Sequence, residues 1–192
     1  MTTITVVRKN GHVAIAADTM TKWGPGKETA EYIVNNHKTF KVGYTVLAIT
    51  GNTTFKAVLV DYFARPKVAA RFDSVHNIFK TWQIMHAVLK EEYFLNASAS
   101  SDDPVESTRV DVLLANKHGI FGVAAHRTVQ EFSKFYAFGS GADYAMGAMY
   151  TTYNDKHRNA EDIAKLAVEA AAEFNDGTGM PLTSYHLKLA KA

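Results

Sequence analysis

Cysteine is absent from the 192-residue chain. This absence excludes disulfide bonds, metal sites built on thiolates and every cysteine nucleophile, so a covalent catalyst would have to use serine, threonine, lysine or a carboxylate. Proline is scarce, with 4 residues. No apolar run approaches the roughly 18 residues of a membrane-spanning helix. We therefore expect a chain without a transmembrane helix, in a reducing cytoplasm.

An excess of either charge is also missing. Lys and Arg total 21 and Asp and Glu total 19, which gives a net charge of +2. With no basic run, this balance argues against nucleic acid as the main partner. The first residues, Met1 to Ile4, lack the basic and apolar regions of a signal peptide. The 8 histidines are not spaced as metal ligands, so no metal or other cofactor is expected.

The composition of the chain is that of an ordinary folded domain. Hydrophobic residues make up 47% and charged residues 21%, and the length fits one domain spanning residues 1–192. No internal repeat or low-complexity tract divides it.

Two kinds of periodicity alternate along the chain. Asn10-Gly11 between two β-rich runs predicts a hairpin over residues 3–18, because both turn positions require positive φ. The remaining pattern predicts a loop at 19–31, strands near 32–42 and 44–50, helices at 52–64 and from Asp73 (as N-cap) to Phe94, a surface loop at 97–107, strands at 108–115, 119–126 and 129–138, helices at 139–150 and 160–174, and a strand near 183–190.

Paired helices and runs of antiparallel strands argue against a doubly wound parallel sheet. Two antiparallel sheets packed face to face, each covered by a helix pair, would bury all the apolar stripes. We therefore expect an α+β fold with four αββα layers.

Thr2 is the first candidate for chemistry. Removal of Met1 would leave a threonine with a free α-amine, which places a hydroxyl nucleophile and its base on one residue; the amine has an ordinary pKa of about 7.7–8.0. Asp18 should end the second strand near Thr2. An ammonium at Lys38 would favour the neutral amine, and Asp18 would hold that lysine.

Two glycine-rich turns complete the candidate set. Gly51 falls between a predicted strand and a predicted helix, where a backbone N–H is a natural donor to an oxyanion. Ser140 lies in Gly139-Ser140-Gly141. It does not fit the Gly-x-Ser-x-Gly elbow of other hydrolases, and an N-cap for the following helix is its simplest role.

Taken together, these motifs resemble the proteasome β-subunit superfamily of N-terminal-nucleophile hydrolases. The opening Thr2-Thr3-Ile4, the Asn10-Gly11 hairpin ending at Asp18, and the run Lys38-Thr39-Phe40-Lys41-Val42 resemble peptidase subunits of the HslV type. The segment between Asp18 and Lys38 is longer than in that type. The chain therefore resembles more closely the divergent proteasome homologue of betaproteobacteria.

The resemblance implies a threonine endopeptidase that hydrolyses peptide bonds of unfolded proteins. It implies catalytic roles for Thr2, Asp18 and Lys38, with Gly51 as the oxyanion donor and Ser140 hydrogen-bonded near the Thr2 amine. The family also has an Asp and a Ser after the penultimate helix. Asp176 and Thr178 are the candidates for these two positions in this chain. The spacing to Thr178-Gly179, however, places Asn175 rather than Asp176 at the Asp position.

Ile49 and Thr53 correspond to positions that line the family's S1 pocket, and both are uncharged, which favours an apolar P1 residue. The resemblance further implies a homo-oligomeric double ring, with two heptamers favoured over two hexamers, and an AAA+ ATPase unfoldase as a possible partner. Two other hypotheses stay open: an N-terminal-nucleophile amidohydrolase of small molecules, and a non-catalytic ring scaffold.

Overall fold

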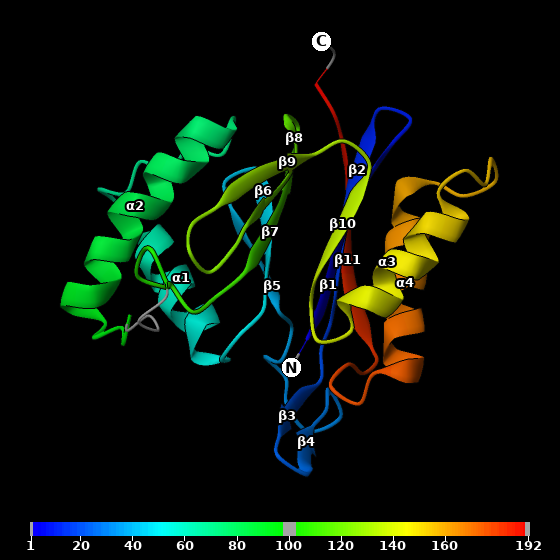
Figure 1. Cartoon of the computed structure of the whole chain (residues 1–192), viewed down its shortest axis with the longest axis horizontal. Coiled ribbons are helices and arrows are strands. Elements are labelled where there is room, and N and C mark those ends of the chain that lie inside the picture. The colour runs from blue at the N-terminus through cyan, green and yellow to red at the C-terminus, as the bar shows by residue number, and fades with distance from the viewer. Residues whose placement is uncertain (1, 98–102, 191–192) are drawn as a thin grey trace.

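The fold consists of two antiparallel sheets between two pairs of helices (Figure 1). The computed structural model describes residues 2–97 and 103–190. The strands are β1 (Thr3–Lys9), β2 (His12–Asp18), β3 (Thr21–Trp23), β4 (Gly26–Glu28), β5 (Thr39–Val42), β6 (Thr45–Ile49), β7 (Val112–Asn116), β8 (Gly119–Val123), β9 (Val129–Phe132), β10 (Phe135–Gly139) and β11 (Leu182–Lys188). The helices are α1 (Thr54–Ala64), α2 (Val75–Glu92), α3 (Ala142–Thr152) and α4 (Ala160–Phe174). The expected four-layer αββα sandwich is confirmed.

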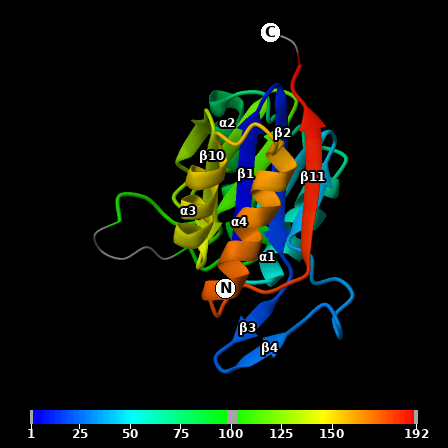
Figure 2. The same cartoon turned by 90° about the vertical axis from the view of Figure 1, so that its right-hand side faces the viewer.

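The two sheets differ in their connectivity. One has the strand order β10-β1-β2-β11 and is covered by α3 and α4 (Figure 2). The other has the order β5-β6-β7-β8-β9, and α1 and α2 pack on its outer face. The first strand of the chain, β1, thus lies inside a sheet, with a neighbour on each side. Where the structure describes the chain, every helix is too short or too polar to span a bilayer.

Alternation along β1 explains the layers. Ile4 and Val6 belong to the apolar core between the two sheets, whereas Val7 belongs to the core beneath α3 and α4. Thr5 also faces that helical layer, and its Oγ1 donates to the carbonyl oxygen of Ala164 in α4, 3.1 Å away. A strand that is buried on both faces moves little, so β1 holds Thr2, the residue before it, in a fixed position.

The N-terminal hairpin forms as predicted. Asn10 and Gly11 have φ values of 51° and 74°, which is the left-handed backbone that an Asn-Gly turn provides. The expected loop at 19–31 was wrong in part, because β3 and β4 form a short hairpin there that extends beyond the sandwich (Figure 1). The strand expected from residue 32 begins only at Thr39.

Two other predictions differ from the structure, and a third is only partly testable. The stretch 129–138 is two strands, β9 and β10, which pair in different sheets. Helix α2 is capped by Ser74, whose side chain accepts from the Asn77 amide, rather than by Asp73. The expected surface loop at 97–107 lies partly outside the described residues.

Candidate active site

Strand register brings Thr2 beside the Gly139-Ser140 turn. In the antiparallel pair of β1 and β10, Thr3 stands opposite Gly139. Gly139 has a φ of +105°, and a Cβ on it would lie 2.0 Å from the Thr2 carbonyl oxygen. Only glycine fits so close an approach in that conformation. As a result, the Thr2 backbone nitrogen lies 3.4 Å from the Ser140 Oγ, to which it donates.

Asp18 and Lys38 form a buried ion pair next to Thr2. Lys38 Nζ lies 2.7 Å from Asp18 Oδ1, and their side chains are 8% and 0% exposed. Asp18 Oδ1 also accepts from the Thr3 amide at 3.0 Å. Its Oδ2 accepts from the amides of Met20 and Gly179. The carboxylate therefore joins the start of β1, the end of β2 and the loop before β11.

Burial governs the titration of this pair. It lowers the pKa of the Lys38 ammonium, and the neighbouring Asp18 opposes the shift. It raises the pKa of the Asp18 carboxyl, against Lys38 and the amide donors. Both shifts have the same cause, because a charged pair away from water loses hydration. Since three amides and an ammonium donate to the carboxylate, we assign the ionised pair at neutral pH.

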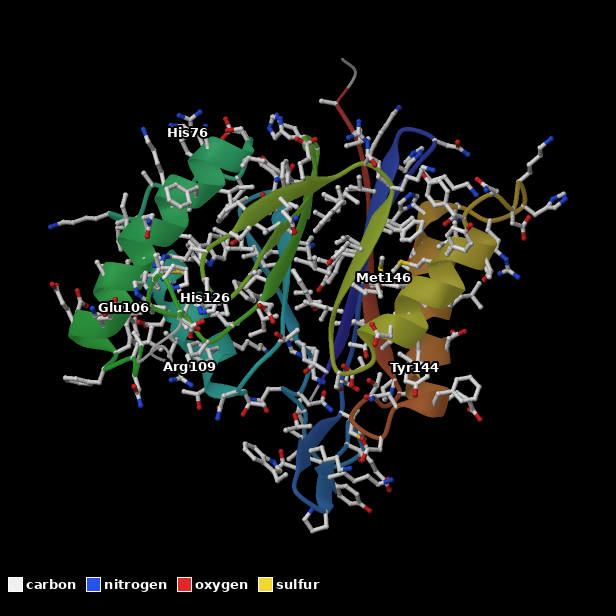
Figure 3. The ribbon with its side chains drawn as sticks, viewed as in Figure 1. His76, Glu106, Arg109, His126, Tyr144 and Met146 are labelled. Carbon is white, nitrogen blue, oxygen red and sulfur yellow. The ribbon has the colours of Figure 1, made fainter. Side chains whose placement is uncertain are left out.

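Gly51 stands where β6 turns toward α1. Its φ is +88°, and a Cβ would lie 2.9 Å from the carbonyl oxygen of Arg109, a residue labelled in Figure 3. The backbone before it is held in the sheet: the Thr50 amide donates to Asp111 O and the Ile49 amide donates to Lys38 O. The second of these bonds places Lys38 and the Gly51 turn at the same end of the sheet.

Ser140 contacts Asn175 as well as Thr2. Its Oγ donates to Asn175 Oδ1 at 2.9 Å, and Asn175 Nδ2 donates back to Ser140 O at 3.1 Å. Thr178 Oγ1 donates to the same Oδ1 at 3.0 Å and lies 2.6 Å from Thr3 Oγ1. Helix α3 is capped by Gly141, so the N-cap role considered for Ser140 was wrong.

Asp176 stands apart from this network. Its exposed carboxylate pairs with Lys22 of β3. Of the two neighbouring residues considered for the second acidic position, Asn175 is the one that contacts Ser140 and Thr178. The chain turns out of α4 at Asn175, the C-cap residue, and this turn directs the two successive side chains differently.

A cleft of about 760 Å³ collects most of the candidate residues. Thr2, Lys38 and Gly51 line it, together with Ile49 and Thr53. The β3–β4 hairpin contributes Trp23 and Glu28 to its wall, which the expectation of a plain loop missed.

Lys56 of α1 is a further lining residue that sequence reasoning missed. Its Nζ donates to the carbonyl oxygens of Asn35 and His37, so it ties α1 to the segment that precedes Lys38. A lysine on the polar side of an amphipathic helix carries no sequence signal for such a contact. In residues 2–97 and 103–190, no three His, Cys, Asp or Glu side chains group together as metal ligands would.

Solved structures of one bacterial protein match this chain over almost its whole length. No protein-family model and no curated protein matches the chain. A solved structure, Thiobacillus denitrificans BPH, matches with a TM-score of 0.94 and 54% identity over 99% of this chain and 100% of that one. The same protein in complex with epoxomicin matches with a TM-score of 0.93 and 53% identity over 98% and 100% of the two chains.

A more distant structure, eukaryotic HslV from Trypanosoma brucei, has a TM-score of 0.65 at 16% identity, over 97% of this chain and 99% of that one. At that identity the similarity shows the fold alone. The match to BPH is much stronger, because more than half of the residues are identical over the whole length. The chain therefore belongs to the family of BPH, the bacterial proteasome homologue, and has the fold of proteasome β-subunit-like peptidases.

Proposed function

We propose that this proteasome-like peptidase is a threonine endopeptidase whose nucleophile is Thr2 after removal of Met1. The observation that carries the proposal is the shared cleft: Thr2, Lys38 and Gly51 line one cavity, and the buried Asp18 carboxylate holds Lys38. A nucleophile, a nearby cation and a backbone donor are the groups that acyl transfer requires.

In the proposed reaction, Thr2 Oγ attacks the scissile carbonyl carbon and the Thr2 α-amine accepts the hydroxyl proton. The Gly51 N–H donates to the oxyanion. The amine then delivers the proton to the leaving amine of the cleaved peptide, and an ester to Thr2 remains. Water hydrolyses this ester with the α-amine again as base, which releases the acid product and restores Thr2.

In the proposed reaction Lys38 assists the base, the Thr2 α-amine, and is not itself the nucleophile. Its ammonium disfavours a second positive charge on the Thr2 amine and therefore lowers the pKa of that amine. Asp18 keeps the ammonium in place through the 2.7 Å bond. An uncharged part of the cleft wall, Ile49 and Thr53, would receive an apolar P1 side chain.

The proposal extends to assembly and substrate. Exposed aromatic residues on the outer helical layer, Tyr144, Tyr150 and Phe174, are 47%, 78% and 69% exposed; Tyr144 is labelled on α3 in Figure 3. The Tyr144 and Phe174 rings lie together, with centroids 5.9 Å apart, and exposed aromatic side chains of this kind favour burial against another subunit. We propose a homo-oligomeric double ring, of two heptamers rather than two hexamers. Its enclosed sites would act on unfolded chains, with an ATPase unfoldase as the possible supplier.

Intact-mass spectrometry before and after a peptide epoxyketone tests the chemistry. This warhead reacts with both the hydroxyl and the free amine of a terminal threonine, and epoxomicin, bound by the Thiobacillus denitrificans protein, is such a compound. We expect loss of Met1 and one adduct per chain, with no adduct in Thr2→Ala. An adduct in Thr2→Ala, or none in a wild-type chain that has lost Met1, would contradict the proposal. Mass photometry of the same samples tests the ring, and a stable monomer would contradict it.

A further inference from the structure

We propose that Asp111 is a positioning residue that sets the direction of the Gly51 N–H. This inference rests on the proposed function, because it concerns the donor to the oxyanion. Asp111 is half-buried and directly precedes β7. It does not line the cleft that contains Thr2, so it would affect the reaction only through other residues.

The peptide unit between Thr50 and Gly51 carries the Gly51 N–H. Its direction therefore depends on how these two residues are held. The Thr50 amide donates to the Asp111 carbonyl oxygen at 2.9 Å, which continues the pairing of β6 with β7 by one residue. On the other side of the peptide, a Cβ on Gly51 would lie 2.9 Å from the Arg109 carbonyl oxygen. Segment 109–111 thus contacts both halves of the peptide unit.

The side chain of Asp111 adds a second link to Thr50. Thr50 Oγ1 accepts from the Asp111 amide at 3.3 Å and lies 3.4 Å from both Asp111 Oδ2 and Asp111 O. The carboxylate is the stronger acceptor of the two, so we assign the single hydroxyl proton to Oδ2. Since Thr50 is only 7% exposed, water competes little for these contacts.

The other carboxylate oxygen anchors segment 109–111 to the turn after β8. Asp111 Oδ1 accepts from the Ala125 amide at 2.9 Å. The backbone pairing of β7 with β8 ends at Val112 and Val123. A side-chain oxygen therefore takes the place of a backbone acceptor where the ladder stops. In this way one residue joins the end of β6, the start of β7 and the turn after β8.

The backbone of segment 109–111 explains why an anchor is needed. Arg109 has a φ of 60°, in the left-handed region that residues with a Cβ rarely adopt. Its carbonyl oxygen is the atom that contacts Gly51. Without the bond from Ala125 to Asp111, Arg109 could relax toward an ordinary φ. The surface against which the Gly51 turn packs would then move, and the Gly51 N–H would turn with it.

A similar arrangement at the opposite end of β7 provides a matched control. Asn116 Oδ1 accepts from the His118 amide at 2.8 Å, and its Nδ2 donates to Thr45 Oγ1 at 3.3 Å. Thr45 begins β6, whereas Thr50 follows the end of that strand. Because Asn116 is only 2% exposed, its truncation should destabilise the fold at least as much as that of Asp111. It should do so without disturbing the oxyanion turn.

The first experiment measures kcat, KM and the midpoint of thermal unfolding of the assembled, Met1-free protein with a fluorogenic peptide. Asp111→Ala should lower kcat roughly tenfold with KM unchanged, because a misdirected N–H weakens binding of the transition state alone. Asp111→Asn should stay within about twofold of wild type, since its amide can accept from Ala125 and donate to Thr50 Oγ1. Asn116→Ala should lower the midpoint and leave kcat unchanged.

Three outcomes of this experiment would overturn the positioning role. They are an unchanged kcat in Asp111→Ala, a loss in Asp111→Asn as large as that in Asp111→Ala, and an equal loss of kcat in Asn116→Ala. If Asp111→Ala does not assemble, Thr50→Val tests the same link with little change of shape. Its kcat should fall and Thr50→Ser should restore it, and equal values in these two variants would contradict the link.

A double-mutant cycle tests whether Asp111 acts through Gly51. Asp111→Ala should lower kcat in the wild-type background but not in Gly51→Ala, where the N–H is already displaced. An equal loss in both backgrounds would contradict the inference. Epoxyketone labelling separates the two levels. If wild-type Thr2 is not labelled, the proposed function fails, whereas normal labelling with an additive cycle contradicts only the role of Asp111.

Discussion

Lys38 and Asp18 form an ion pair that almost no solvent reaches, and the carboxylate also accepts amide hydrogen bonds from Thr3, Met20 and Gly179. One side chain thus links three segments that are far apart in the sequence. The carboxylate thus holds the fold together at the place where, in the proposed reaction, it also holds Lys38.

Asp18→Asn should destabilise the fold strongly. It leaves the Lys38 ammonium buried without a counter-charge, and such a change costs about 3–5 kcal/mol. Urea denaturation gives the free energy of unfolding. Glu131→Gln is the control, because the Glu131 pair with Arg8 has side chains 47% and 39% exposed; its loss should cost less than about 1 kcal/mol. An equal loss of unfolding free energy in the two variants would show that burial does not make the Asp18 pair more important for stability than an exposed pair.

Gly51→Ala should lower kcat strongly, and should lower the free energy of unfolding less than Asp18→Asn does. The φ of +88° and the 2.9 Å approach to Arg109 O leave no room for a Cβ without moving the backbone, so the N–H proposed to contact the oxyanion would be displaced. We expect kcat to fall roughly 100-fold. Gly43→Ala is the matched control, since Gly43 also has a positive φ, of +58°, but open space around it. An active Gly51→Ala enzyme would remove Gly51 from the mechanism.

Substrate preference should respond to Thr53. This residue lines the Thr2 cleft, whereas the adjacent Thr54 lines a different pocket. Wild-type protein should prefer apolar P1 residues in a peptide library, and Thr53→Glu should shift the preference toward Lys and Arg through charge complementarity. Thr54→Glu should leave the preference as it is. A shift in both variants, or in neither, would contradict the assignment of Thr53 to the P1 site.

Acid stability should depend on Asp73. Hydrogen bonds from the Arg71 and Asn77 side chains lower the pKa of Asp73 from 3.8 to about 2. Because its folded-state pKa is lowered, the ionised Asp73 carboxylate stabilises the fold at pH values above 3.8, the ordinary pKa. This contribution is lost as the pH falls from 3.8 through about 2. The stability difference between wild type and Asp73→Asn should therefore narrow over that range. Carboxyl ¹³C NMR should show the Asp73 titration moving upward in Arg71→Met; an unmoved titration would contradict the assigned cause.

Much of the fold followed from local signals that packing does not override. Asn10-Gly11 marks its hairpin because few other pairs accept positive φ at both positions. Helix α4 was predicted over 160–174 and runs from Ala160 to Phe174, because Asn159 provides a capping box and Asn175 ends it. The β3–β4 hairpin was missed, since its strands are three residues each and carry no alternation.

Candidate residues at the ends of strands could be predicted from the sequence. Those whose contacts depend on the path of the chain after a helix or through an irregular segment were harder to predict. Asp18 is the last residue of β2 and Lys38 directly precedes β5, so the topology brings both near Thr2. The choice between Asn175 and Asp176 depended on how the chain leaves α4, which spacing does not encode. The role of Lys56 depended on contacts with the irregular segment before Lys38, and an irregular segment has no periodicity to indicate its path.

The position of β1 within its sheet sets a condition on timing in the cell. Thr2 is only 3% exposed, and the strand that follows it is hydrogen-bonded to β2 on one side and β10 on the other. Strand β10 is more than 130 residues further along the chain, so it emerges from the ribosome late. An aminopeptidase that needs an extended, accessible terminus reaches the Met1–Thr2 bond most readily during that interval. The proposed removal of Met1 therefore competes in time with the closure of the first sheet, and we expect it to occur on the nascent chain.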